Sequence, residues 1–301
     1  MIELSAEEKK IFKRAKEFSL KKIYPEASFW ENNPGYSKEA MRLMADAGYC
    51  GLNIPEKLGG RGYNFLETAL AYEGLAHGDA AVPSSQIQLH NNILYTLSKF
   101  YDDNKVIKKI FPEIVNGSKL LAFAITEEHS GSDPASMKSY AELKEDGYHI
   151  YGKKAWIFNS LEADYYIVIV KNATVDTREM LMFLINRDNP GLKVTEDRPL
   201  LGNNCISCCN ILLEDCVVSK DRLITKDAFK EALKFIDLPR TFVPAIAIGM
   251  AQRVIDLTVD YLGERKSFNK AIIKNQGIQW ELSELLARVE AGRWLVYRTA
   301  S

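Results

Sequence analysis

The spacing of apolar residues changes twice along this chain, and the two changes divide it into three segments. Before residue 121, apolar residues recur at the helical period, as at Phe12, Ala15 and Phe18. From Leu121 the period becomes two, which is typical of strands, and from Lys226 the helical period returns. The pattern therefore predicts an α+β protein with domains at residues 1–120, 121–222 and 223–301.

Each segment has an expected architecture. The first is predicted to be all-α, with five or six helices. The second is predicted to be a small antiparallel β-barrel or sandwich, because its seven candidate strands are short and separated by turn signals: 121–125, 139–143, 148–157, 165–170, 180–185, 192–195 and 210–216. In the third, the helix over 242–262 is apolar on most faces in its first half, so we expect it to be buried in a helical bundle.

Charge and hydropathy exclude several classes of partner. The 301 residues carry 39 Lys and Arg against 40 Asp and Glu, so electrostatics give no reason to expect nucleic acid or an anionic membrane as a partner. No apolar run reaches the ~18 residues of a membrane span. The acidic start, Glu3 to Glu8, lacks the apolar core of a signal peptide. We therefore expect a cytoplasmic protein, or one of a matrix-like compartment, without a membrane span.

The five cysteines do not predict a metal site. Cys205, Cys208 and Cys209 crowd together, and Cys-x-x-Cys is half of a zinc-binding pattern, but no second half with His or Cys follows. We expect no bound metal and reduced, partly buried thiols.

The stretch 121–159 has the features of a site for a flat cofactor. A short apolar strand is followed by a polar turn over 126–133, in which Gly131 permits close approach of a ligand and Thr126 and Ser132 supply hydroxyl donors. A second strand then ends at Trp156. Strand ends, hydroxyls and an aromatic face are what a planar, heteroatom-edged cofactor needs.

Three motifs of this stretch resemble the acyl-CoA dehydrogenases: Ile125-Thr126-Glu127, Gly131-Ser132-Asp133 and Lys154-Ala155-Trp156-Ile157. The resemblance covers almost the whole chain. It implies an N-terminal helical domain, a middle β-domain and a C-terminal four-helix bundle, with FAD as cofactor. The implied reaction is α,β-dehydrogenation of an acyl-CoA thioester, as in fatty acid metabolism: a carboxylate takes the α-proton, flavin N5 takes the β-hydride, and an electron-transfer flavoprotein reoxidises the flavin.

The resemblance implies two groups of FAD-binding residues. Phe123, Ile125 and Thr126 match positions on the pyrimidine side of the flavin, Gly131 and Ser132 belong to the adjoining turn, and Trp156 and Phe158 match positions near N5. Phe158 departs from the family, which has Thr or Ser there, and a phenyl ring cannot bond N5.

The second group is Arg265, Ser267, Phe268 and Gln276, which match an element that reaches the FAD of a neighbouring subunit. We therefore expect at least a homodimer, and a homotetramer or a complementing subunit is left open.

Ser132 and Arg240 match positions that contact the substrate, and Asp237 lies one turn before Arg240. The catalytic base is not found. One family position for it is occupied here by Pro239, and the other would lie beyond Ser301. This leaves three possibilities: a fragment of a longer dehydrogenase, a subunit completed by a partner, or a relative without catalysis. A flavin oxidase or monooxygenase on the same fold is a further alternative.

Overall fold

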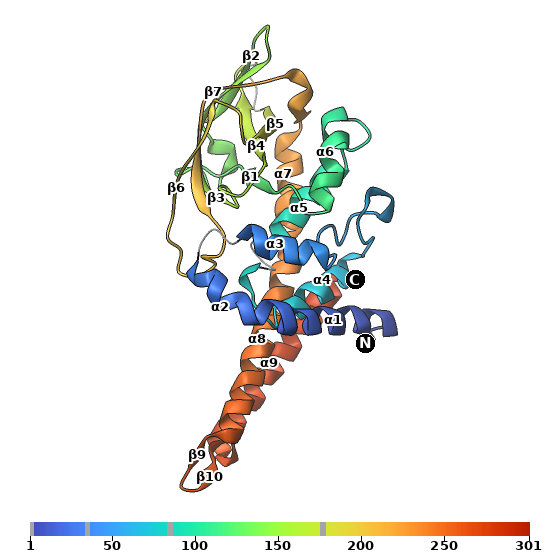
Figure 1. Cartoon of the computed structure of the whole chain (residues 1–301), viewed down its shortest axis with the longest axis vertical. Coiled ribbons are helices and arrows are strands. Elements are labelled where there is room, and N and C mark those ends of the chain that lie inside the picture. Colours follow the sequence, from blue (N-terminus) through green and yellow to red (C-terminus); the bar gives the residue numbers. More distant parts are fainter. Residues whose placement is uncertain (1–2, 34–36, 83–86, 175–178) are drawn as a thin grey trace. The chain divides into compact units, whose positions relative to one another are not determined.

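The computed structural model describes residues 3–33, 37–82, 87–174 and 179–301 (Figure 1). They form two compact units, each assembled from segments that are distant in the sequence. Unit 1 comprises Met1–Ser28, Tyr63–Ser84 and Arg240–Ser301, and unit 2 comprises Phe29–Gly62 and Ser85–Pro239. The predicted boundaries of three consecutive domains stay a prediction.

Unit 2 contains an eight-stranded sheet. Its strands are β1 (Leu121–Ala124), β2 (Tyr140–Leu143), β3 (Tyr148–Phe158), β4 (Tyr165–Asn172), β5 (Met180–Asn186), β6 (Leu192–Asp197), β7 (Cys208–Val218) and β8 (Leu223–Thr225). The order is β6-β7-β3-β2-β4-β5-β8, with β1 also paired to β4. β1 and β2 both pair with β4 in parallel, and the other pairs in this sheet are antiparallel.

The central strands of the sheet are buried on both faces. Along β4, Tyr166, Val168 and Val170 pack into one apolar core, whereas Ile167 and Ile169 pack into the other. The second core is completed by residues of three helices, α5 (Leu89–Ser98), α6 (Lys105–Val115) and α7 (Ala228–Asp237). The nearly continuous apolar run of β4 follows from burial on both sides.

The remaining helices of unit 2 are short. α3 covers Ser37–Asp46, and α2 (Tyr24–Asn32) begins in unit 1 and ends in unit 2. The start of α6 is fixed by Asn104, whose side chain accepts bonds from the backbone N–H groups of Val106 and Ile107.

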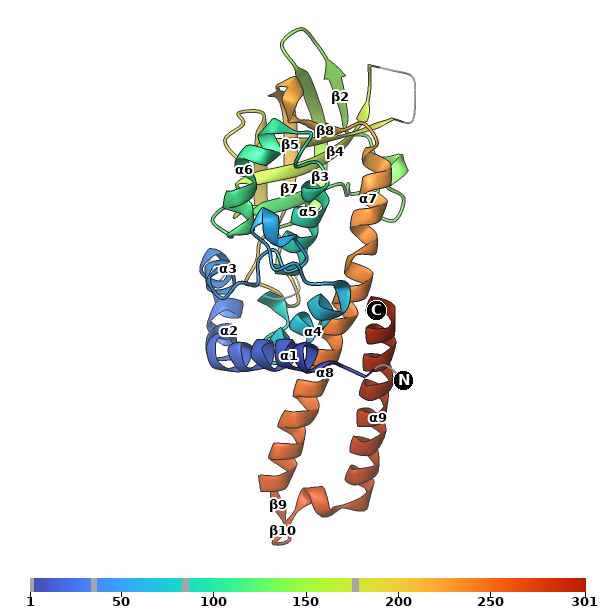
Figure 2. The same ribbon diagram turned by 90° about the vertical axis from the view of Figure 1, so that its right-hand side faces the viewer.

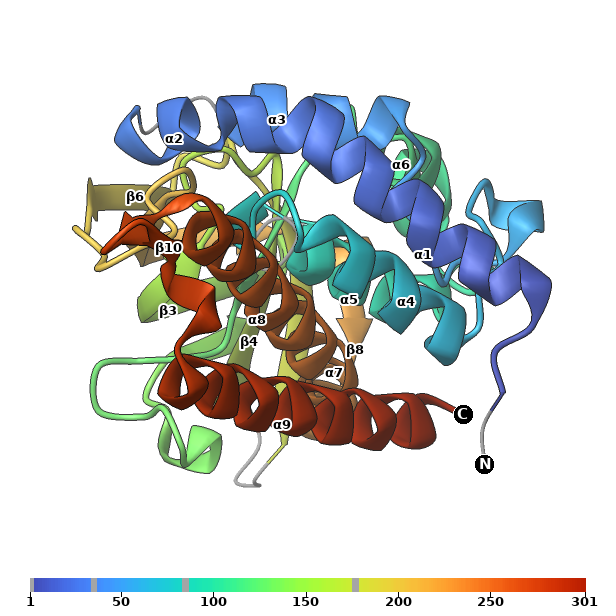
Figure 3. The ribbon, with the colours of Figure 1, turned by 90° about the horizontal axis from the view of Figure 1, so that it is seen from below.

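Unit 1 is helical. α1 (Ala6–Phe18) continues into a π-helical turn (Ser19–Ile23), and α4 (Phe65–Leu75) lies beside α1 (Figure 3). The starts of α1 and α4 carry capping boxes, made by Ser5 with Glu8 and by Asn64 with Glu67. α8 (Pro239–Glu264) and α9 (Gln276–Ala300) run antiparallel and are joined by the hairpin of β9 (Lys266–Ser267) and β10 (Lys270–Ala271) (Figure 2).

A buried carboxylate connects α4 to α9. Glu73 is buried and accepts bonds from Arg293 Nε at 2.8 Å and from the Tyr297 hydroxyl at 2.7 Å. Gly249 of α8 passes so close to the backbone of Glu73 that an added Cβ would lie 2.2 Å from the Glu73 carbonyl oxygen. These contacts fix three helices of unit 1 around one charged group.

The expected burial of α8 is only partly met. Phe242, Ala245 and Ile246 are buried, but Val243 is 45 % and Met250 47 % exposed. Among the described residues, the neighbours of α8 do not cover all of its apolar faces, which is why the sequence pattern overstated its burial.

By length and composition alone, the segment Ala228–Glu264 would also qualify as a membrane span, since an 18-residue window has a mean hydropathy of 1.4. Core helices meet the same criterion, so this is weak evidence. The absence of a span stays a prediction.

The five cysteines are all buried and unbridged, and Cys208, Cys209 and Cys216 lie in β7. Within the described ranges, no group of three or more His, Cys, Asp and Glu side chains is arranged to hold a metal ion. The expected lack of a metal stays a prediction.

Candidate functional site

The turn after β1 and the end of β3 are bonded to each other. The backbone N–H of Ala155 donates to the carbonyl of Thr126 at 2.8 Å. Ile125 and Thr126 are half-buried at this junction. Two predicted cofactor-binding segments, which are well separated in the sequence, therefore meet in space.

The end of β3 has an irregular backbone that exposes Trp156. Trp156 and Asn159 have φ values of 60° and 59°, which are uncommon for residues with a side chain. The pairing of β3 with β7 shifts register between Lys154 and Ile157, which marks a β-bulge. Ala155 and Ile157 are buried, whereas Trp156 is 50 % exposed. The irregularity thus presents a large aromatic ring at the surface.

Arg198 lies against this ring. Its guanidinium carbon is 3.9 Å from the centre of the Trp156 ring, which is a cation–π contact. The guanidinium also donates to the side chains of Asn210 at 2.9 Å and Glu128 at 3.3 Å. Trp156 is therefore held by an arginine that is itself anchored.

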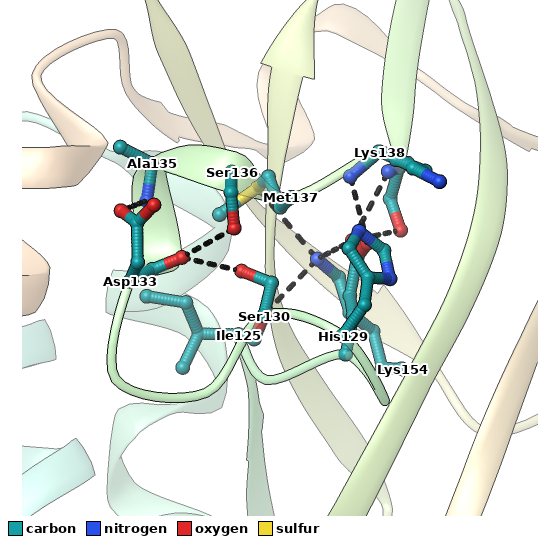
Figure 4. A network of polar contacts seen from close by, with 11 residues as sticks. Ile125, His129, Ser130, Asp133, Ala135, Ser136, Met137, Lys138 and Lys154 are labelled. Atoms are coloured by element: carbon teal, nitrogen blue, oxygen red, sulfur yellow. Dashed lines mark hydrogen bonds and ion pairs between the residues drawn. The ribbon is translucent and has the colours of Figure 1, made fainter.

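A buried ion pair lies close to the same junction in the sequence, and Figure 4 labels its lysine, Lys154. Lys154 Nζ lies 2.9 Å from Glu127 Oε1, and the two side chains are 0 % and 4 % exposed. Burial lowers the pKa of Lys154 to about 8, although Glu127 opposes this shift. Burial alone would raise the pKa of Glu127, but the charge of Lys154 and hydrogen bonds from Lys138, Lys154 and Ser139 lower it to about 2.

The two pKa shifts act differently on the charges of the pair. The lowered pKa of Lys154 favours its neutral amine, whereas the lowered pKa of Glu127 favours its charged carboxylate. Lys154 Nζ has two oxygen acceptors, at 2.9 and 3.1 Å. That geometry suits an ammonium group, so both side chains are charged at neutral pH.

The glycine-bearing turn is ordered by its own side chains. Ser130 and Ser136 hydroxyls both donate to the Asp133 carbonyl, at 2.6 and 2.8 Å (Figure 4). A Cβ added to Gly131 would meet nothing within 4 Å, and Ser132 is exposed. The surface in front of this turn is open.

The two predicted phenylalanines lie in different surroundings. Phe123 is 9 % exposed and stacks on Phe235 of α7, with ring centres 3.9 Å apart. Phe158 is half-buried and lies opposite Cys208 of β7. Phe123 therefore belongs to the apolar core beneath the junction.

The second predicted cofactor group lies in unit 1. Arg265, Ser267, Phe268 and Gln276 are all exposed around the β9–β10 hairpin and the start of α9. Phe268 is 99 % exposed and has a φ of 49°.

The predicted substrate residues are also divided between the units. Ser132 and Asp237 belong to unit 2 and Arg240 to unit 1, and all three are exposed. Pro239, at the first position of α8, occupies the place where the resemblance would put a base.

A separate cleft of about 660 Å³ in unit 2 contains none of the predicted residues. It lies along α3 and the turn before β1, and its lining includes Lys38, Arg42, Asp46, Lys119 and Asp164. Its lining is polar, and Lys119 is already paired with Asp164 at 2.9 Å.

The sequence did not predict the contacts of the site that join residues far apart in the chain. No local sequence pattern marks Arg198 as a site residue, because it reaches Trp156 only when β6 pairs with β7 and β7 pairs with β3. Glu127 and Lys154 stood in the recognised motifs, but nothing in the sequence showed that they are buried together.

Comparisons with known proteins cover nearly all of this chain. The N-terminal, middle and C-terminal domain models of acyl-CoA dehydrogenases match residues 5–118, 122–216 and 229–301. An acyl-CoA dehydrogenase of Bacillus subtilis is 29 % identical over 291 residues, which is 96 % of this chain and 76 % of that protein.

Solved structures agree with these matches. The glutaryl-coenzyme A dehydrogenase–glutaryl-CoA complex is 30 % identical, with a TM-score of 0.90 over 100 % of this chain and 77 % of that one. The FAD complex of PigA is 25 % identical, with a TM-score of 0.88 over 100 % of this chain and 79 % of that one. The predicted order of a helical, a β and a helical region is confirmed. The chain belongs to the acyl-CoA dehydrogenase family.

Proposed function

We propose that this chain is an FAD-dependent oxidoreductase that acts on the CH–CH bond of an acyl-CoA thioester. The observation that carries the proposal is the bonded junction of Thr126 and Ala155, which places an open, hydroxyl-bearing turn beside the exposed ring of Trp156. The similar FAD complex of PigA and the glutaryl-CoA complex support both the cofactor and the class of substrate.

The residues at the junction fit a flavin. Trp156 offers a flat apolar surface, and the open space at Gly131 allows a planar ring to approach the backbone. The hydroxyls of Thr126 and Ser132 are donors for the heteroatoms of the ring. FAD, when bound, supplies a hydride acceptor.

The chain's own residues orient the reactants. Ile125 and Trp156 would cover part of the bound ring, and Arg198 holds the indole in place. Within unit 2, Ser132 and Asp237 are proposed to bind the thioester. In unit 1, Arg240 is proposed to bind an anionic group of the substrate. The acceptor of the α-proton is not assigned, since Pro239 cannot accept a proton.

The exposed group at the hairpin supports an oligomer. Arg265 directly precedes β9, Ser267 ends β9, Phe268 lies in the turn and Gln276 begins α9, and all four are exposed. We propose that they contact the FAD of a neighbouring subunit, and that an electron-transfer flavoprotein accepts the electrons. A cytoplasmic location stays part of the proposal.

The test is the visible absorption spectrum of the FAD-loaded full chain, recorded without oxygen before and after adding butanoyl-, glutaryl- or longer-chain acyl-CoA. Bleaching by one thioester supports the proposal. FAD that binds but never bleaches would reject dehydrogenation by this chain alone and would favour a subunit completed by a partner, which co-purification would reveal.

One observation favours a second candidate, a flavin oxidase or monooxygenase. Phe158 is half-buried near the end of β3 and offers no hydroxyl to the flavin. The comparison is the rate of reoxidation by oxygen of the reduced wild type and of Phe158→Thr. Fast reoxidation of the wild type, slowed in the variant, would favour the oxidase.

A further inference from the structure

The buried ion pair of Glu127 and Lys154 connects the two segments that the proposed function places against FAD, and the inference drawn from it rests on that function. Glu127 directly follows Thr126, and Lys154 stands two residues before Trp156. Neither charged group reaches the surface where Trp156 is exposed. The pair therefore lies behind the site and does not touch a ligand in front of it.

Lys154 holds the turn from its strand side. Its Nζ donates to the carbonyl of Ile125 at 3.1 Å and to Glu127 Oε1 at 2.9 Å, and it lies 3.7 Å from Met137 Sδ. These bonds fix the residues on both sides of Thr126. Together with the bond from Ala155 to Thr126, they leave the turn little freedom to move relative to β3.

Glu127 holds the far end of the same turn. Its Oε1 accepts from the backbone N–H of Ser139 at 3.0 Å and from the Ser139 hydroxyl at 2.6 Å, and its Oε2 accepts from the N–H of Lys138 at 2.7 Å. Ser139 in turn packs on Gly152 of β3, where an added Cβ would lie 2.2 Å from Ser139 Oγ. The carboxylate thus ties the beginning and the end of the 125–139 segment to β3.

We propose that Glu127 and Lys154 are positioning residues, whose buried pair fixes Thr126 and Trp156 at the spacing that FAD requires. Stability alone does not account for such a pair, because a buried ion pair is often no more stabilising than apolar residues of similar volume. An apolar pair makes no directional bonds and would therefore not fix the spacing between the two binding segments.

The test uses three kinds of variant of the full chain. Lys154→Met and Glu127→Gln each remove one charge, and the double variant Glu127→Gln/Lys154→Met removes both, so that no unpaired charge stays buried. Ser139→Ala keeps both charges and removes one bond to Glu127. The matched control is Lys193→Gln, which removes an exposed partner of Glu214 from β6, another strand of the same sheet.

The measurements are the FAD dissociation constant and the visible circular dichroism per bound flavin, which reports the surroundings of the ring and does not depend on turnover. Thermal unfolding of each apo variant reports stability separately. We expect the double variant to recover stability relative to the single variants, yet to bind FAD at least about tenfold more weakly and with an altered spectrum. Ser139→Ala should shift both flavin readouts in the same direction by less, and Lys193→Gln should stay within about twofold of the wild type.

If the wild-type chain binds FAD, three results would overturn the positioning role. One is a double variant with the FAD affinity and flavin spectrum of the wild type, which would make the pair purely structural. Another is an equal loss of FAD affinity in Lys193→Gln. If the charge variants do not fold, an unchanged flavin spectrum and affinity in Ser139→Ala decides against it. A wild-type chain that binds no FAD would instead reject the proposed function, and the positioning role with it.

Discussion

The guanidinium of Arg198 lies 3.9 Å from the centre of the Trp156 ring, so an arginine that directly follows β6 supports the exposed aromatic residue at the end of β3. Trp156 is 50 % exposed and lies in the left-handed region of φ. Its orientation therefore depends on this contact more than on packing.

Arg198→Ala is expected to free the indole without unfolding the protein. A partly exposed cation–π contact is worth about 0.5–1 kcal/mol, so the loss of stability should be of that size. Acrylamide should quench Trp156 more strongly in the variant, measured as the difference from the same experiment in a Trp156→Phe background. Equal quenching of Trp156 in the wild type and in Arg198→Ala would show that the cation–π contact does not hold the indole ring.

Phe235→Ala is expected to lower the free energy of unfolding by about 3–5 kcal/mol, because it leaves a cavity against the buried ring of Phe123. Chemical denaturation measures this change. Phe229→Ala on the same helix is the control, since Phe229 is 39 % exposed and its truncation leaves no enclosed cavity. A loss below about 1 kcal/mol for Phe235→Ala would contradict the stacked arrangement.

Glu127 should make the protein sensitive to acid. Its pKa is lowered from 4.5 to about 2, so its contribution to stability is fully present above 4.5 and is lost as the pH falls towards 2. We expect the melting temperature to fall across this range, and to fall less steeply in Glu127→Gln. The same slope in both proteins would mean that other carboxylates cause the acid response.

His149 should act in the opposite direction, as the pH rises above 6.5. Its ring nitrogens lie 2.8 Å from Asp146 and 2.6 Å from Asp215, and hydrogen bonds to these two carboxylates raise the pKa of His149 above 6.5. The contribution is therefore fully present below 6.5 and is lost as the pH rises through the raised value. The melting temperature should decline there in the wild type and not in His149→Gln, and an NMR titration of the His149 ring gives the pKa directly.

Arg293→Met should destabilise unit 1 by about 3–5 kcal/mol, since it leaves Glu73 buried without its cationic partner. Arg288→Met on the same helix removes an exposed pair with Glu284 and should cost less than about 1 kcal/mol. Denaturation curves of the two variants make the comparison. Equal costs would show that Glu73 is less isolated from water than its burial indicates.

The sequence predicted the regular elements of the sheet well, because their signals are local. The apolar run over 165–170 predicted β4, which extends from Tyr165 to Asn172. β8 was missed, since the three residues Leu223–Thr225 are too few to establish a period. The parallel pairing of β1 with β4 was also missed, because alternation shows which face a side chain lies on and not which strand is its neighbour.

The candidate site was predicted through its motifs, and its physical supports were not. Charged residues are almost never fully buried unless they are paired, so Lys154 and Glu127 would have been placed at the surface from residue type alone. Arg198 contacts Trp156 across two strand pairings, and no spacing in the sequence encodes that contact.

The mixed origin of unit 1 has a consequence for the growing polypeptide. Helix α4 carries Glu73 early in the chain, but its partners Arg293 and Tyr297 are in α9 and leave the ribosome more than two hundred residues later. Until then the carboxylate has neither its guanidinium nor its phenol and stays in water. Helices α1 and α4 are therefore synthesised early, but their packing is completed only when α9 has been synthesised. The sheet of unit 2 has all its strands between residues 121 and 225 and can assemble while synthesis continues.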